Sequence, residues 1–157
     1  MRKIFSFLMV LVFVGGSLVA GDLKVPKDAK DPMFRWNVNK YGNLVCEIEL
    51  KNGKKAYFSS VKSMMDFYFR PWYYEEYGAK TDKDIKKIYV QDYITGKVID
   101  AKKAYYIFGS RLVGPKGDDL IALADKNTAK MFKMKYGGTK VLRFDRITKG
   151  LIKYLDM

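Results

Sequence analysis

The chain has 157 residues, a formal net charge of +13 and 48% hydrophobic residues, so it can build a core and is not a disordered protein. It contains no histidine and one cysteine, Cys46. These counts exclude Ser-His-Asp and Cys-His hydrolases, an internal disulfide and covalent c-type haem, and we expect no enzyme.

The first 20 residues have the layout of a secretory signal peptide. The basic pair Arg2-Lys3 precedes an apolar stretch at residues 4–14, and small residues follow up to Ala20. The apolar stretch is shorter than the roughly 20 residues that span a bilayer. We therefore expect residues 1–20 to be cleaved on export and the protein to be periplasmic. An uncleaved membrane anchor is the alternative.

The end of this signal also resembles a lipoprotein box, Leu18-Val19-Ala20-Gly21, which would precede a lipid-bearing cysteine. Here Asp22 occupies the acceptor position, and a carboxylate cannot form the thioether that carries the lipid. We therefore expect a soluble monomer without a stable membrane anchor. Lys and Asp alternate around two prolines in residues 21–32, which predicts a flexible N-terminal segment.

Residues 33–78 are predicted to form a first small α+β unit. Asn43–Leu50 alternates apolar and polar residues as a strand does, Asn52-Gly53 is a hairpin turn, and Lys55–Phe58 is the returning strand. A helix is expected over Ser60–Phe69, because apolar residues recur at helical spacing and Pro71 stops the pattern.

Residues 85–157 are predicted to form a second such unit. Strands are expected near residues 85–93, 98–99, 104–108, 120–124 and 140–144, with helices over Asn127–Tyr136 and residues 147–155. The segment Ile121–Lys130 parallels Ala56–Met65, because each is a strand that runs into a helix capped by a side chain. The pattern indicates two small α+β units, with a boundary in Trp72–Asp84.

The second half also carries a long series of short motifs. They are Asp92-Tyr93, Thr95-Gly96, Ile99-Asp100-Ala101, Ala104-Tyr105-Tyr106, Gly109-Ser110, Gly114-Pro115, Gly117, Gly137-Gly138 and Leu142-Arg143-Phe144-Asp145. In this order they resemble the NosL family, the periplasmic copper-binding accessory proteins of nitrous-oxide reductase. The resemblance covers roughly Met33 to Thr148. It implies two packed ββαβ-type units, copper(I) as cargo, and nitrous-oxide reductase or another periplasmic copper-handling protein as partner.

The family's ligand motifs are altered in this chain. Copper(I) favours thiolate and thioether ligands, and the family places a Cys-Gly-Met motif before the first hairpin. The matching triplet is Asp31-Pro32-Met33, which keeps the thioether and replaces the thiolate by a carboxylate. In Gly114-Pro115-Lys116-Gly117 a lysine stands where the family usually has methionine. Met33 and Cys46 are therefore the candidate metal ligands.

The other sulfur atoms have structural interpretations. Cys46 shares a strand face with Leu44 and Ile48, so a buried, inert thiol is the alternative to a ligand. Two methionines, Met64 and Met65, lie on the apolar face of the first predicted helix and are expected in the core. A second pair, Met131 and Met134, is expected at a partly buried helix edge. Met157 is terminal.

Two functions follow from the resemblance. The first is an accessory protein in copper handling and maturation of nitrous-oxide reductase, with a weak, sulfur-only copper(I) site. The second is a protein-interaction module that has lost copper binding, in which the aromatic loop Trp72–Tyr77 is the contact patch. That loop can instead pack over the junction of the two units. The dispersed lysines indicate a solvated surface or docking to an anionic protein or membrane, and export argues against nucleic acid.

Overall fold

The computed structural model describes residues 22–157, and the predicted signal peptide lies outside the described residues. The strands are β1 (Cys46–Leu50), β2 (Lys55–Phe58), β3 (Ile85–Gln91), β4 (Val98–Asp100), β5 (Tyr105–Phe108), β6 (Ile121–Leu123) and β7 (Lys140–Arg143). The α-helices are α1 (Val61–Phe69), α2 (Lys126–Tyr136) and α3 (Lys149–Leu155). Short 3-10 helices lie at Val38–Lys40, Gly42–Leu44, Pro71–Tyr73, Glu75–Tyr77, Asp82–Asp84, Ala101–Lys103 and Phe144–Arg146.

The strands form two antiparallel sheets with the same internal order. The first sheet has the order β2-β1-β3-β4 and the second has the order β6-β5-β7. The first strand of each unit, β1 or β5, lies between the second and the third strand of the same unit. The helix of the unit, α1 or α2, connects the second strand to the third. In the first sheet, β4 is added beside β3. This repeat of β1-β2-α1-β3 by β5-β6-α2-β7 confirms the prediction of two small ββαβ-type units packed together.

The second sheet begins with β5 at Tyr105, whereas the sequence predicts that the second unit begins at residue 85. Both β3 and β4 pair within the first sheet, through β3 to β1 and through β4 to β3. Residues 85–100 thus supply the third strand of the first ββαβ unit and an added edge strand. Local sequence patterns indicate a strand at 85–93 but do not encode which neighbour it pairs with, because the pairing depends on residues far apart in the chain.

Side-chain caps start the two main helices where the sequence predicts them. The Ser60 hydroxyl accepts a hydrogen bond from the Ser63 amide at the start of α1, and the Asp125 carboxylate accepts one from the Thr128 amide at the start of α2. The predicted helices Ser60–Phe69 and Asn127–Tyr136 are confirmed. In the same way, Thr148 caps α3.

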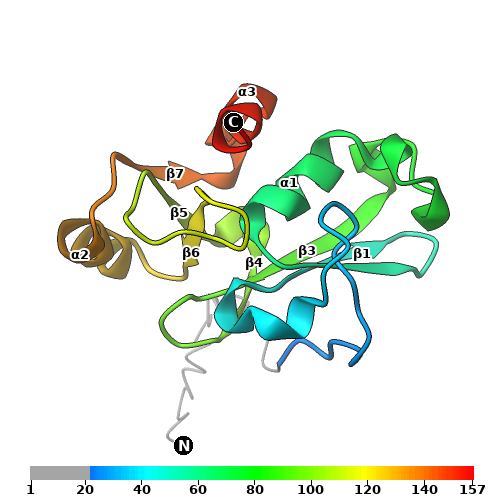
Figure 1. Ribbon diagram of the computed structural model, residues 1–157, viewed down its shortest axis with the longest axis horizontal. Helices are drawn as coiled ribbons and strands as arrows, with labels where there is room; N and C mark the ends of the chain where they lie inside the picture. Colours follow the sequence, from blue (N-terminus) through cyan, green and yellow to red (C-terminus); the bar gives the residue numbers. More distant parts are fainter. Residues whose placement is uncertain (1–21) are drawn as a thin grey trace, which may run out of the picture.

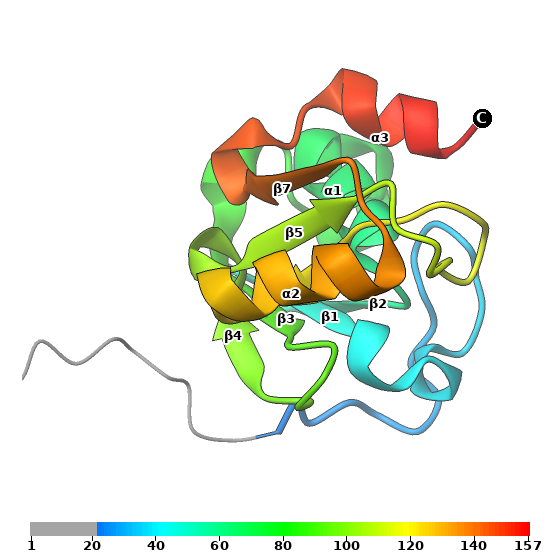
Figure 2. The ribbon, with the colours of Figure 1, turned by 90° about the vertical axis from the view of Figure 1, so that its left-hand side faces the viewer.

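The two sheets share one hydrophobic core. Alternate residues of β5 and β6 face this core, and the residues between them face α2. Tyr106 and Ala122 face the same buried cluster as Ile48 of β1, whereas Ile107 and Ile121 pack against α2. Figures 1 and 2 show α2 on the outer side of the second sheet and α3 beside α1. The second sheet is therefore covered on both faces. Within residues 22–157, none of the helices has the length and apolar character to span a bilayer.

The N-terminal segment that the sequence predicts to be flexible makes several contacts. The Tyr57 hydroxyl donates to the Lys24 carbonyl at 3.2 Å, the Asn39 amide side chain donates to the Pro26 carbonyl at 2.9 Å, and the Val38 amide donates to the Ala29 carbonyl at 3.0 Å. These bonds place residues 24–29 against the start of the first unit. They lead directly into Asp31 and Met33.

Candidate functional site

Asp31, which the resemblance aligns with a copper-binding cysteine, is a structural residue here. It is fully buried, and its Oδ1 accepts from the amides of Met33 at 2.8 Å and Phe34 at 3.0 Å. Its Oδ2 accepts from the Ser59 amide at 2.7 Å and the Ser59 hydroxyl at 2.6 Å. A carboxylate has about four lone-pair sites, so these donors occupy all of them. Asp31 therefore fastens the Met33 loop to the end of β2 and has no electron pair left for a metal ion.

Met33 lies beside Asp31 at the edge of the protein interior. It is half-buried, packs against the shared core, and lines a groove of about 350 Å³ together with Phe69, Trp72 and Ile152. The groove lies between the end of α1, the following 3-10 helix and α3. Met33 supplies the one sulfur atom of the Asp31-Pro32-Met33 motif, and this residue lines an open groove.

The second altered motif lies next to the first in space. The Gly114 amide donates to the Gly117 carbonyl at 2.7 Å, which closes a tight turn around Pro115-Lys116. From this turn the Lys116 ammonium lies over the Phe34 ring, 5.5 Å from its centre. The structure therefore brings the Asp31–Phe34 and Gly114–Gly117 segments together, and it places a positive charge beside the residue that follows Met33.

A buried lysine holds the second motif in place. Lys62 of α1 is fully buried, and its Nζ donates to the Lys116 carbonyl at 2.8 Å and to the Leu155 carbonyl at 3.0 Å. It therefore links α1 to the Lys116 turn and to the end of α3. The sequence pattern did not identify Lys62, because both of its acceptors are distant in the chain and a lysine in an amphipathic helix is usually solvated.

Cys46 lies in the core and not at the groove. It is 1% exposed, it lies opposite Phe58 in the β1–β2 ladder, and its Sγ donates to the Leu44 carbonyl at 3.3 Å. Burial raises the pKa of the thiol well above its usual value, and the nearby carboxylates of Asp119 and Asp31 raise it further. The thiol is therefore protonated at neutral pH and shielded from solvent.

We expect Cys46 to resist thiol reagents in the folded protein. Incubation with iodoacetamide at pH 8 should leave it unmodified for hours, because both the thiolate fraction and the exposure are small. Unfolding in guanidinium should allow complete alkylation within minutes. Intact-mass spectrometry reads both results. Rapid labelling of the folded protein would show that this region opens and that the thiol is available as a ligand.

Asp119 is the second buried carboxylate of this region. Its Oδ1 accepts from the amides of Lys62 and Leu120, both at 2.8 Å. Within the described chain its Oδ2 has no hydrogen-bond partner, and it lies so close to Gly114 that a Cβ atom there would approach it to 2.5 Å. Burial is the main cause that raises the pKa of Asp119 to about 6. A glycine is needed at position 114 because only its backbone fits against this carboxylate.

The raised pKa of Asp119 predicts a specific dependence of stability on pH. Below about pH 3 the side chain is mostly protonated in both the folded and the unfolded states. Between about pH 3 and pH 6 the unfolded chain loses its proton first, so the free energy of unfolding falls by about 3 kcal/mol in total and stays lower above pH 6. Asp119→Asn should remove this decrease.

Chemical denaturation of the wild type and Asp119→Asn at pH 4 and pH 7.5 measures this effect. We expect the stability of the variant relative to the wild type to increase by about 2 kcal/mol between the two pH values, because part of the titration of the unfolded chain lies below pH 4. The comparison cancels the contributions of other carboxylates, which titrate in both proteins. A constant difference between the two proteins would mean that Asp119 has an ordinary pKa.

The remaining predicted surface features have mixed outcomes. The expectation that Met131 and Met134 lie at a partly buried edge is wrong, because they are 70% and 85% exposed on the outer face of α2. In the aromatic loop, Trp72 and Tyr73 are exposed, whereas Tyr74 is buried and donates to the Asp66 carboxylate. The loop thus both packs on the core and presents aromatic rings to solvent. As predicted, Met64 and Met65 are buried in the core.

The donor set of this region offers little for a tightly held metal ion. Within residues 22–157, no group of three or more Cys, Asp and Glu side chains is arranged to hold one. Asp31 is saturated, Cys46 is a buried thiol, and Lys116 contributes an ammonium group. The Met33 thioether remains as one soft, partly exposed donor.

Comparisons with known proteins agree with this fold. A family model described as NosL matches residues 22–152. The chain is 40% identical to the copper-binding lipoprotein NosL of Stutzerimonas stutzeri over 58 residues, which are 37% of this chain and 30% of that protein. This match therefore spans less than a third of the length of that relative.

A solved crystal structure shows the same architecture. The crystal structure of the copper chaperone NosL from Shewanella denitrificans aligns with a TM-score of 0.68 at 22% identity, over 80% of this chain and 93% of that chain. The apo-NosL protein from Achromobacter cycloclastes, solved by NMR in solution, aligns with a TM-score of 0.49 at 25% identity, over 68% of this chain and 87% of that chain. Since the family model covers nearly all of the described residues, the chain belongs to the NosL family.

Proposed function

We propose that this protein is a periplasmic accessory protein in copper handling, that it serves the maturation of nitrous-oxide reductase, and that it binds copper(I) weakly through Met33. Membership of the NosL family supports the copper role, because the relatives are described as a copper-binding lipoprotein and a copper chaperone. The observation that carries the proposal is the position of Met33, whose thioether lines an open groove at the family's ligand motif.

The ligand set supports low affinity for copper. A soft cation needs two or more sulfur or nitrogen donors for tight binding, and the chain contains no histidine. The Cys46 thiol is buried and protonated, which makes Met33 the first ligand to be engaged. Weak binding suits a protein that passes its cargo on, because the cation must also leave.

A second function has one specific observation in its favour. The Lys116 ammonium lies over Phe34 where the family usually carries a methionine, and its backbone is fixed by Lys62. A positive charge at this position opposes binding of a cation beside Met33. On this alternative the protein is an interaction module that no longer binds copper, and the exposed rings of Trp72 and Tyr73 are its contact patch.

Complementation in a denitrifying bacterium that lacks its own NosL gene tests the proposed function. The wild-type gene should restore nitrous-oxide reductase activity and the copper content of the purified reductase. Met33→Ala should restore less of both, because it removes the proposed donor. Full restoration by Met33→Ala would support the interaction module, and no restoration by the wild type would refute a role in this maturation.

The same strain tests the location of the protein. We expect it in the periplasmic extract, beginning near residue 21 or 22 and without a lipid adduct, because Asp22 cannot accept one. Mass spectrometry of the purified chain gives both the first residue and the adduct. Retention of residues 1–20 or a diacylglyceryl adduct would contradict this expectation.

A further inference from the structure

One edge of β3 is unpaired over half of its length. The strand pairs with β1 from Ile85 to Tyr89, with an irregular register between Ile85 and Lys87, but β4 pairs only with Tyr89, Val90 and Gln91. On the β4 side, residues 85–88 therefore have no neighbouring strand among the residues described. An exposed strand edge presents main-chain donors and acceptors that can pair with another chain.

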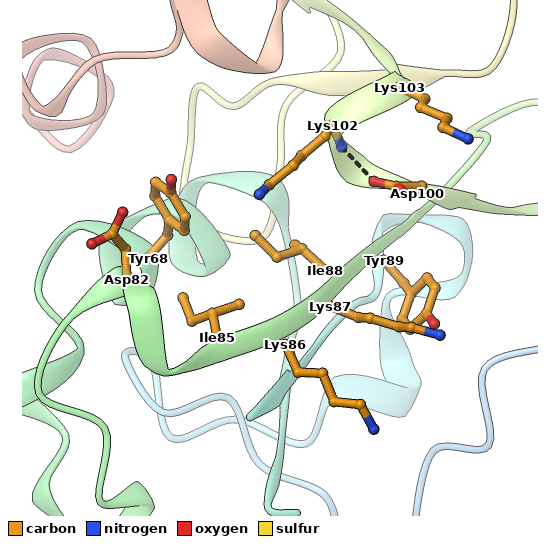
Figure 3. A pocket seen from close by; sticks show the side chains of 10 residues that line it. All are labelled: Tyr68, Asp82, Ile85, Lys86, Lys87, Ile88, Tyr89, Asp100, Lys102 and Lys103. Atoms are coloured by element: carbon orange, nitrogen blue, oxygen red, sulfur yellow. Dashed lines mark hydrogen bonds between the residues drawn. The ribbon is translucent and has the colours of Figure 1, made fainter. Parts of the chain in front are cut away.

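A groove runs beside this unpaired stretch. It has a volume of about 390 Å³ and lies between β3, Tyr68 of α1 and the 3-10 helix Ala101–Lys103. Figure 3 shows Ile85 and Ile88 along the strand and the side chain of Lys102 extending over Ile88 toward Tyr68. The groove thus combines an apolar base with a polar rim, as sites that bind an extended peptide do.

The rim of the groove is mainly basic. Four lysines line it, namely Lys86, Lys87, Lys102 and Lys103, together with two aspartates, Asp82 and Asp100. Asp100 already accepts from the Lys102 amide at 2.9 Å, and Lys86 pairs with Glu49 at 2.7 Å. Among the described residues, the other three lysines form no ion pair. These three ammonium groups can therefore pair with an anionic ligand, with Lys102 directed toward Tyr68 and with Lys87 and Lys103 directed to the side of Tyr89 (Figure 3).

Contacts from the second sheet hold the lysine turn in a defined position. The Arg143 guanidinium donates to the Lys103 carbonyl at 2.9 Å and to the Lys102 carbonyl at 3.4 Å, and it lies over the Tyr105 ring at 4.4 Å. Because the turn is already ordered, a ligand does not have to order it on binding.

We propose that this groove binds an extended acidic segment of a partner polypeptide, which adds as a strand along residues 85–88 of β3. The unpaired stretch is about 14 Å long at roughly 3.4 Å per residue, enough for a segment of about four residues. Main-chain hydrogen bonds to β3 supply general affinity, and carboxylates of the segment meet Lys87, Lys102 and Lys103. Arg2 and Lys3 of the predicted signal peptide carry two of the +13 charges, so the rest of the chain remains strongly basic and favours an acidic partner. This site does not include Met33 and stands independently of copper binding.

Fluorescence anisotropy with a labelled, end-blocked hexapeptide of alternating Glu and Val tests the site on the purified protein at low salt. We expect saturable binding of this peptide and at least about tenfold weaker binding when alternate amides are N-methylated. N-methylation keeps the charge and removes the donors that an added strand needs. Equal binding of both peptides, or no binding at millimolar protein concentration, would overturn strand addition.

A pair of charge-matched double variants tests the location. Lys87→Glu/Lys102→Glu changes two lining lysines, and Lys130→Glu/Lys135→Glu makes the same change in net charge on the exposed face of α2. We expect the first pair to weaken binding by at least about tenfold and the second by less than about threefold. Circular dichroism checks that both variants remain folded. Equal weakening by both pairs would show that the peptide responds to overall charge and not to this groove.

Discussion

Asp31→Ala should destabilise the folded protein by about 3 kcal/mol, because it removes an acceptor of four hydrogen bonds from a fully buried position. The variant leaves the amides of Met33, Phe34 and Ser59 without a partner in a region that water does not reach freely. The loss is a large part of the stability of a domain of this size. Denaturant unfolding at pH 7 measures it.

Two further variants show whether the hydrogen bonds cause this loss. Ser59→Ala should lower the free energy of unfolding by about 1 kcal/mol, because Asp31 keeps the hydrogen bond from the amide of residue 59 and loses only the one from the hydroxyl. Asp118→Ala, on an exposed aspartate, should change stability by less than about 0.5 kcal/mol. If Asp31→Ala were no more destabilising than Asp118→Ala, the carboxylate would be free to act as a ligand.

Lys116→Met should increase the affinity for copper(I) by about tenfold or more, because it replaces a positive charge by a second thioether beside the Met33 segment. The change restores the residue type that the family usually has between the proline and the glycine. The backbone of the turn should persist, since Lys62 binds the carbonyl of residue 116 and not its side chain.

The matched control for Lys116→Met is Lys51→Met, which makes the same exchange at an exposed position of the β1–β2 turn. Anaerobic competition with a chromogenic copper(I) chelator measures both affinities. We expect no more than about a twofold change for Lys51→Met. Equal gains in both variants would mean that any added methionine binds copper, and no gain in Lys116→Met would remove the Gly114–Gly117 turn from the site.

Local patterns were sufficient to predict the repeated units of the fold. The strand-to-helix segments ending in α1 and α2 follow from apolar spacing and from side chains near each helix start that can cap within one helical turn, and the structure identifies the caps as Ser60 and Asp125. The place of β3 in the first sheet could not be predicted in this way. It depends on pairing with β1, which lies far away in the sequence.

The same distinction applies to the candidate site. The sequence identified Asp31 and Lys116 as the altered motif positions and Met33 as the retained one, and the structure places their segments together. The sequence could not show that Ser59 donates two of the four hydrogen bonds that occupy the Asp31 carboxylate, or that Lys62 is buried. Both outcomes depend on contacts between segments that are distant in the chain.

An anaerobic copper(I) competition titration of the purified wild type, Met33→Ala and Cys46→Ser tests the central claim most directly. The wild type should bind copper(I) weakly, Met33→Ala should bind it at least about tenfold more weakly still, and Cys46→Ser should bind as the wild type does. These results follow from the Met33 thioether at the family's ligand motif and from the buried, protonated thiol, whereas the exposed Met131 and Met134 lie on the outer face of α2. Tight binding that Met33→Ala leaves unchanged, or that only Cys46→Ser abolishes, would contradict the claim.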